Sequence, residues 1–197
     1  LELQSYFADD GQTGISATPG AGASVDLWIL GSSLFGAQLA AALGLPYAFA
    51  SHFAPDALDQ ALAIYRRDFK PSPQLDRPYA MAGFNVFAAD TDAEAELLAS
   101  SQQQSFVALR TGNPRQLPPP VAGYRDSLGA QGSAILDHVL QCSAVGSPAT
   151  VARGLAAFVE RTHVDEIMVA SAIYDHDARK RSLSLTADAL HEMKQAA

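Results

Sequence analysis

Two adjacent serines, Ser32 and Ser33, stand where a short apolar run gives way to a segment rich in alanine and leucine. The run Val25–Leu30 has the length and hydrophobicity of a parallel strand covered on both faces, and it stops at Gly31. Residues 34–43 are predicted to form a helix. The first N–H groups of such a helix lack intrahelical partners and lie at the positive end of its dipole. Together with the serine hydroxyls they can hold a phosphate.

The same serines also suit a simpler role. Serine is a favoured helix N-cap, where its hydroxyl accepts a hydrogen bond from an N–H of the first turn. A Gly-Ser-Ser sequence is also a weak motif beside a full glycine-rich fingerprint. The residues alone therefore leave two hypotheses for Gly31–Gly36: a phosphate-binding loop, or a helix start capped by Ser32 or Ser33.

His52 is the second candidate for chemistry. It stands near the end of another apolar stretch, Leu45–Phe53, which we interpret as a strand. A neutral imidazole there can donate a hydrogen bond or transfer a proton near neutral pH. The alternative is a packed histidine that supports the following Ala54–Pro55 turn. The remaining histidines have charged or helical neighbours, so we expect solvated or capping roles for His138, His163, His176 and His191.

The elements that must position these residues follow a repeating order. Four strand candidates alternate with helices, which predicts a parallel sheet with right-handed crossovers. Four strands do not close a barrel, because an eightfold barrel needs twice as many units. The chain is then either an open doubly wound sheet or one half of a barrel. The strands are expected at 25–30, 45–53, 79–88 and 165–171, and the helices at 34–43, 57–69, 93–109, 134–141, 149–162 and 178–195.

A proline-rich stretch, Arg110–Gly132, interrupts this order after the third strand and its helix. Connections this long are uncommon in a compact domain and are usually functional or mobile. We interpret the stretch as a lid or substrate-contact segment over the site, with a simple surface insertion as the alternative. Asn85 and Ser171, near the ends of the last two strands, are expected to face the same rim as satisfied polar residues.

Composition bounds the class of protein. The 197 residues are 48% hydrophobic and 17% charged, which is typical of a globular domain. The net charge of −8, with no basic cluster, argues against nucleic acid as a partner. The single cysteine, Cys142, cannot form an internal disulfide, and no Cys/His spacing indicates a metal site, so a cytoplasmic setting is expected. No apolar stretch reaches the roughly 18 residues of a membrane span.

Several stretches together resemble the bacterial luciferase-like flavin-dependent monooxygenase family. They are Trp28–Ser33, Gln38–Pro46, Phe49–Phe53, Val145–Pro148 and Asp165–Val169. The resemblance runs from about residue 20 to the end of the chain. It implies a (β/α)8 TIM barrel that binds flavin mononucleotide (FMN) at the C-terminal ends of its strands. Residues 1–197 would form a single domain that supplies strands 5–8 and their helices.

The resemblance also implies a function. The loop Gly31, Ser32, Ser33, Leu34, Phe35 and Gly36 matches the segment that holds the flavin phosphate, with Phe35 and Gly36 where some relatives have threonines. The implied enzyme uses reduced FMN from a separate flavin reductase, and O2, to oxidise a small organic substrate. Deazaflavin (F420) is the alternative cofactor, and a flavin-binding protein without turnover is the alternative function. A homodimer is expected.

The N-terminal sequence LELQSYFADD has no basic region and does not begin with methionine. It resembles neither a signal peptide nor a natural start. Since the eightfold barrel requires a first half, we expect about 130 further residues upstream in the natural protein.

Overall fold

The computed structural model describes residues 2–8 and 17–196, with side chains described as far as His191. Within these residues the chain forms an α/β fold on one five-stranded parallel sheet. The elements in chain order are α1 (Glu2–Phe7), β1 (Ile29–Gly31), α2 (Leu34–Leu43), β2 (Tyr47–Phe49), α3 (Leu58–Asp68), β3 (Ala80–Ala88), α4 (Asp92–Arg110), the 3-10 helix η1 (Arg125–Ser127), α5 (Ala130–Val139), β4 (Ser143–Gly146), α6 (Pro148–Thr162), β5 (Glu166–Ala170) and α7 (His176–Ala196).

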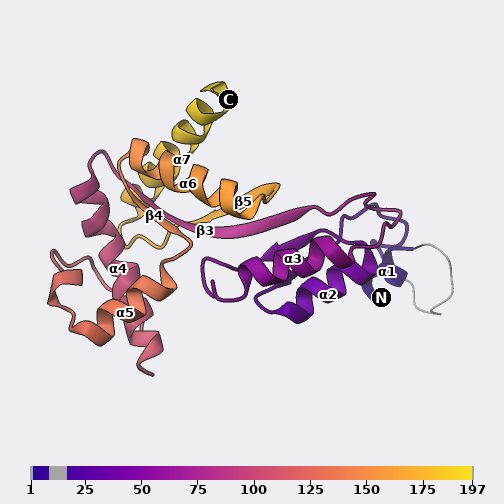
Figure 1. Cartoon of the computed structure of the whole chain (residues 1–197), viewed down its shortest axis with the longest axis horizontal. Helices are drawn as coiled ribbons and strands as arrows, with labels where there is room; N and C mark the ends of the chain where they lie inside the picture. The colour runs from indigo at the N-terminus through magenta and orange to yellow at the C-terminus, as the bar shows by residue number, and fades with distance from the viewer. Residues whose placement is uncertain (1, 9–16, 197) are drawn as a thin grey trace.

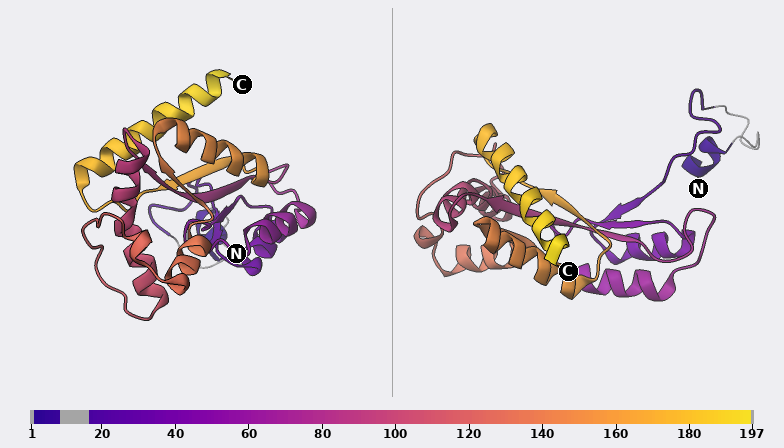
Figure 2. Two further views of the ribbon diagram at one scale, coloured as in Figure 1. Left: turned by 60° about the vertical axis from the view of Figure 1, so that its left-hand side comes forward. Right: turned by 90° about the horizontal axis from the view of Figure 1, so that it is seen from above.

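The long strand β3 organises the sheet and runs through the middle of the molecule (Figure 1). Ala82 pairs with both β2 and β5, and Asn85 pairs with both β4 and β5. β5 therefore follows one edge of β3, while β2 and β4 share the other edge. β1 pairs with β2 on the side away from β3. Figure 2 shows the same strands from two further directions.

One face of the sheet carries the main core. Alternate side chains of β3, among them Phe84 and Val86, are buried there against α2, α3 and α6. Tyr47 and Phe49 of β2 point to the same core. The alternation follows from the two-residue period of a strand, and the small alanines of α2 allow that helix to lie close to the sheet.

The opposite face of the sheet is open over β1 and β5, whereas Phe87 of β3 is buried on that face against Ala99 and Ile173. Leu30 of β1 is 72% exposed and Met168 of β5 is 56% exposed, although both are large apolar side chains. The prediction that Val25–Leu30 is covered on both faces is therefore wrong for this chain. The strand is also shorter than predicted, since the backbone of Leu27 bonds to the side chain of Gln74 rather than to a neighbouring strand.

The prediction of four strands is also wrong, because β4 is a fifth strand. Its four residues follow α5 almost directly and contain only two apolar side chains, Ala144 and Val145, so periodicity does not reveal them. The helix before β4 begins at Ala130, four residues earlier than predicted, after an extended Gly129. β2 covers three residues rather than nine. The glycine-rich composition of residues 9–24 predicts a loop, and residues 9–16 of that stretch lie outside the described residues.

The remaining predictions of elements are confirmed within a residue or two. The side chain of Thr91 caps α4, since it accepts a hydrogen bond of 3.2 Å from the N–H of Glu94. The parallel sheet with helical crossovers is confirmed as well. None of the helices within residues 2–8 and 17–196 combines the length and hydrophobicity that crossing a bilayer requires.

Candidate functional site

The segment Gly31–Gly36 leaves the sheet where the C-terminal ends of β1 and β2 lie side by side. Gly31 pairs in register with Phe49, and the carbonyl of Gly31 accepts a 2.9 Å hydrogen bond from the N–H of Ala50. This bond ties the start of the segment to the chain that leads from β2 to His52. Two stretches that are distant in sequence are thereby placed at one edge of the sheet.

The start of α2 is open to solvent. Ser32, Ser33 and Phe35 are exposed, whereas Gly36 is buried against the ring of Tyr47. Ser33 occupies the N-cap position with extended backbone angles (φ −140°, ψ 167°), but its side chain makes no cap hydrogen bond. The capping interaction that the simpler hypothesis requires is therefore not formed. Ser33 therefore leaves the first N–H groups of α2 without a side-chain acceptor, as an anion site requires.

Tyr47 positions this segment, and sequence reasoning missed it. Its ring is fully buried in the core, and its hydroxyl donates a 3.2 Å hydrogen bond to the carbonyl of Ser33. Burial raises the pKa of Tyr47 to about 12, so the hydroxyl keeps its proton and remains a donor at neutral pH. The sequence did contain a signal for this role, a tyrosine inside an apolar strand. A buried phenol hydroxyl usually has a hydrogen-bond partner, so such a tyrosine indicates a polar contact in the core.

His52 lies just beyond β2, with its ring against Gly83 of β3. A side chain at position 83 would overlap the imidazole. The ring fits in this position because residue 83 is a glycine, which has no Cβ. The carbonyl of His52 accepts a 2.7 Å hydrogen bond from the side chain of Asn85. Its Nδ1 atom is buried and has no partner among the described atoms. Burial lowers the pKa of His52 from its ordinary value, which favours the neutral ring.

A pocket of about 360 Å³ opens beside this imidazole on the uncovered face of the sheet. Its wall is almost wholly apolar, and His52 is the titratable side chain among its lining residues. Leu30, which directly precedes Gly31, contributes to the same wall. The pocket is lined by Trp28, Leu30, Ala48, Phe49, Ala50, His52, Met81, Gly83 and Met168.

The other polar residues expected at the rim take structural positions. Asn85 is only 3% exposed, and its side chain bridges the carbonyl of His52 and the hydroxyl of Ser143 at 3.4 Å. It therefore fixes the backbone of His52 rather than facing the pocket. Ser171 directly follows β5, and its hydroxyl is buried without a partner among the described atoms. The prediction that Ser171 is a satisfied polar residue is therefore wrong for the described part of the chain.

The remaining histidines lie away from the apolar pocket. Nε2 of His138 lies 2.8 Å from a carboxylate oxygen of Asp56, and His163 is the C-cap of α6 with a positive φ of 50°. His176 begins α7, and His191 is exposed on that helix. Across the part of the chain that the structure describes, no group of three or more His, Cys, Asp or Glu side chains is placed to hold a metal ion.

The segment after α4 packs back onto that helix. The side chain of Gln104 donates a 2.9 Å hydrogen bond to the carbonyl of Pro119, and the hydroxyl of Ser100 accepts a 2.8 Å bond from the N–H of Val121. The stretch expected to be a loop over 110–132 contains η1 and the beginning of α5. Within the described residues, the lining of the His52 pocket includes none of this segment.

The sequence profile described as luciferase-like monooxygenase matches residues 5–166. The chain belongs to the luciferase-like monooxygenase family. A luciferase-like monooxygenase of Escherichia coli strain K12 is 47% identical over 193 residues, which cover 98% of this chain and 58% of that protein. The chain thus spans little more than half the length of this relative.

Two solved structures have a fold similar to that of this chain. The crystal structure of apo-MsnO8 matches with a TM-score of 0.80 at 29% identity, over 96% of this chain and 58% of that chain. The oxygenating constituent of a 3,6-diketocamphane monooxygenase from Pseudomonas putida, solved in complex with FMN, matches with a TM-score of 0.54 at 23% identity. It covers 91% of this chain and 52% of that chain, and at this identity the match shows a shared fold.

Proposed function

We propose that the protein is an FMN-dependent monooxygenase that uses reduced flavin and O2 to oxidise a small organic substrate. The observation that carries this proposal is the open start of α2, set at the same sheet edge as a neutral, half-buried histidine and an apolar pocket. Membership of the luciferase-like monooxygenase family supports it, and so does the FMN complex of the Pseudomonas putida protein with a similar fold.

The residues present fit a flavin phosphate. Ser32 and Ser33 offer exposed hydroxyls that no cap bond occupies, and the first turn of α2 offers backbone donors beside them. No lysine or arginine lies between Gly31 and Gly36, so the countercharge has to come from another part of the protein. The open, uncharged sheet face beside Leu30 suits the flat apolar ring system of a flavin.

The side chains of this chain have distinct roles in the proposal. Ser33 and the N–H groups of α2 bind the phosphate, while Tyr47 holds the Ser33 carbonyl in place. The apolar wall excludes water from the reacting centre, and the neutral imidazole of His52 holds or transfers a proton at its rim. Bound FMN would supply the redox chemistry and the reaction with O2.

We also propose that β1, β2, β3 and β5 correspond to strands 5–8 of a (β/α)8 barrel. The support is their parallel order, the helices on one face, and the exposed apolar side chains on the other. The relatives are longer than this chain, and the first four strands of a barrel would cover that face. A homodimer and a separate flavin reductase that supplies reduced FMN complete the proposal.

The test uses the full-length protein in two steps. Titration with FMN and, separately, with F420 should show binding of FMN with the higher affinity. Reduced FMN is then mixed with air-saturated buffer in the presence and absence of the protein. The enzyme should alter the rate of flavin reoxidation and delay the release of hydrogen peroxide.

Each other outcome overturns a defined part of the proposal. Preferential binding of F420 would identify the deazaflavin-dependent alternative. FMN binding with hydrogen peroxide released as fast as from free reduced FMN would identify a flavin-binding protein without turnover. Binding of neither cofactor would contradict the assignment of the α2 start as a phosphate site.

A further inference from the structure

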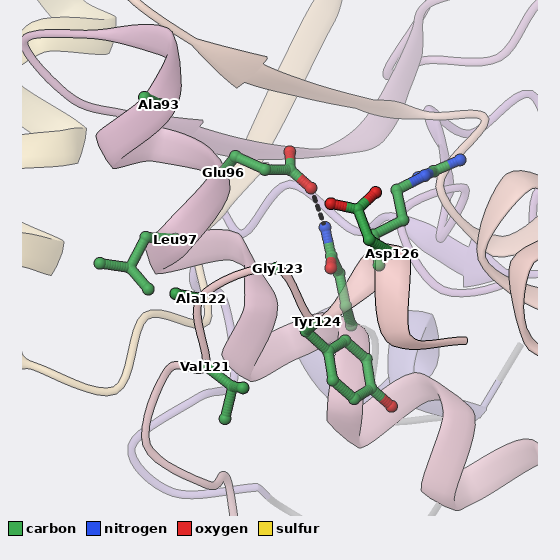
Figure 3. A pocket seen from close by; sticks show the side chains of 10 residues that line it. Ala93, Glu96, Leu97, Val121, Ala122, Gly123, Tyr124 and Asp126 are labelled. Carbon is green, nitrogen blue, oxygen red and sulfur yellow. Dashed lines mark hydrogen bonds between the residues drawn. The ribbon is translucent and has the colours of Figure 1, made fainter.

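The pocket beside His52 differs in polarity from a second pocket of the molecule. The second pocket, of about 460 Å³, lies between α4 and the segment 121–126, and the carboxylates of Glu96 and Asp126 face it (Figure 3). Within the part of the chain that the structure describes, the lining of the His52 pocket contains no Asp, Glu, Lys or Arg. Its side chains include two with nitrogen, Trp28 and His52, and none with oxygen. An indole N–H can only donate, so the imidazole decides whether these side chains also offer a nitrogen acceptor.

One edge of the imidazole lies against the backbone of β3. A Cβ on residue 83 would overlap Nδ1 of His52 most, followed by Cε1 and Cγ. Nε2 therefore belongs to the ring edge that points away from Gly83. Among the described residues neither ring nitrogen has a hydrogen-bond partner, but only Nδ1 is buried. Nε2 is thus the nitrogen that a ligand in the pocket can reach.

Two hydrogen bonds fix the backbone around this ring. The fully buried hydroxyl of Ser51 donates a 2.6 Å hydrogen bond to the carbonyl of Gly83. The side chain of Asn85 donates a 2.7 Å hydrogen bond to the carbonyl of His52. Both bonds tie the segment that carries the imidazole to β3. The ring is therefore positioned before a ligand arrives, which reduces the entropy cost of binding.

The burial of Nδ1 determines which nitrogen carries the proton of the neutral ring. A neutral imidazole has one N–H, and its other nitrogen is an acceptor. A proton on Nδ1 would bury a donor that has no acceptor, whereas a proton on Nε2 leaves only an unused acceptor in the interior. Buried donors without a partner are the rarer of the two in proteins. Nε2 therefore carries the proton, and the burial that lowers the pKa of His52 keeps the ring in this neutral form.

We propose that His52 is a specificity-determining residue, whose Nε2–H donates to a carbonyl oxygen of an uncharged substrate with an apolar body. An alcohol at this position would leave its own hydroxyl proton without an acceptor among the lining side chains. A carboxylate would lose its hydration beside a wall that offers no countercharge. The inference rests on the proposed function, which makes this pocket part of the site of a small organic substrate.

Three probes with the same phenyl ring test this selectivity. Acetophenone, 1-phenylethanol and benzoate are titrated separately into the full-length protein without flavin, by isothermal titration calorimetry at about pH 8, where the His52 ring is neutral. Acetophenone should bind at least about fivefold more tightly than 1-phenylethanol, and benzoate should bind most weakly. Equal or tighter binding of the alcohol would overturn the proposal, because an unprotonated Nε2 accepts from a hydroxyl. Tighter binding of benzoate would overturn it as well.

One variant and one matched control assign the selectivity to His52. His52→Phe keeps a flat ring in the pocket and removes the donor, so the preference for acetophenone over 1-phenylethanol should disappear. His191→Phe makes the same change at an exposed position on α7, outside the pocket lining, and should keep the preference. A preference that persists in His52→Phe would contradict the proposal. Circular dichroism confirms that each variant is folded.

Two further measurements use the parent protein alone. Nitrogen-15 NMR of the His52 imidazole should show the proton on Nε2, and a proton on Nδ1 would overturn the proposal even if His52→Phe does not fold. Acetophenone should still bind after saturation with FMN, whereas its displacement would show that the flavin takes the position next to His52 and would overturn the assignment to the substrate. Absence of FMN binding would contradict the flavin assignment and leave the flavin-free titrations valid.

Discussion

At the residue scale, the hydroxyl of Ser33 separates the two hypotheses for the start of α2. It makes no cap hydrogen bond, and the residue is exposed. If it binds the flavin phosphate, Ser33→Ala removes one hydrogen bond to a charged group, which is worth about 1 kcal/mol or more. The dissociation constant for FMN should then rise by at least about fivefold in a fluorescence titration.

The stability of the same variant is the control for Ser33. Loss of an N-cap costs about 1 kcal/mol of unfolding free energy, whereas an exposed hydroxyl without a cap bond contributes little. We therefore expect urea denaturation of Ser33→Ala without FMN to match the parent protein. If Ser33→Ala lowers the stability and leaves the FMN affinity unchanged, Ser33 is a helix cap and does not bind the phosphate.

The burial of His52 makes a prediction about pH. Because the folded-state pKa lies below the ordinary value of 6.5, the unfolded chain takes up a proton first as the pH falls. The stability contributed by the neutral ring is complete above about pH 6.5 and decreases below it. Urea denaturation between pH 7.5 and pH 5 should therefore show a shallower loss of stability in His52→Gln than in the parent protein.

The exposed His191 on α7 provides the comparison for this pH dependence. His191→Gln should keep the slope of stability against pH that the parent protein shows. An identical slope in all three proteins would mean that His52 is not desolvated in solution.

At the scale of elements, most helices could be predicted from neighbouring residues, whereas strand β4 depends on pairing with a distant segment. Thr91 caps the start of α4, and Ser147 followed by Pro148 marks the start of α6. Each signal lies within a few residues of the helix start that it marks, so the starts of these two helices could be predicted to within a residue or two. β4 could not, because its four residues become a strand only through pairing with Asn85–Ala88 of β3. Strand formation by so short a segment depends on its partner more than on its own sequence.

The same distinction applies to the candidate site. Gly31–Gly36 and His52 could be predicted to lie at one edge, since parallel strands end on the same side and a βα loop follows each strand. The roles of Tyr47 and Asn85 could not, because each depends on a contact with a residue at least 14 positions away.

The attachment of the proline-rich segment to α4 leads to a prediction at this scale. The hydroxyl of Ser100 accepts the hydrogen bond from the N–H of Val121, and Ser100 is only 2% exposed. Ser100→Ala leaves that N–H without its partner, at a cost of about 1 kcal/mol to the docked state. Amide hydrogen exchange in the full-length protein should therefore speed up for peptides that cover residues 119–123.

A serine within the segment provides the matched control for Ser100. Ser127→Ala removes a hydroxyl whose hydrogen bond, in the part of the chain that the structure describes, goes to the carbonyl of Tyr124, the N-cap residue of η1. Exchange at 119–123 should be unchanged in this variant. Equal exchange in Ser100→Ala and the parent protein would show that the segment is not held through this bond.

At the scale of the whole molecule, the two faces of the sheet differ sharply. One face is packed under α2, α3 and α6, while the other carries large apolar side chains in contact with solvent. Exposed apolar patches of this kind mark surfaces that another part of a protein covers. The chain spans 58% of its Escherichia coli relative, so the proposed first half of the barrel is the natural cover.

A charge on the open face tests this arrangement. Met168 is 56% exposed in this chain, but the proposed barrel would bury it in the full-length protein. Met168→Asp should then destabilise the full-length protein by more than about 3 kcal/mol, because a carboxylate would be buried without a partner. Leu183→Asp, at a 43% exposed position on α7, should change stability by no more than about 0.5 kcal/mol. Chemical denaturation of both variants measures the difference. Equally small effects would mean that Met168 stays in contact with water and that no further strands close over this sheet.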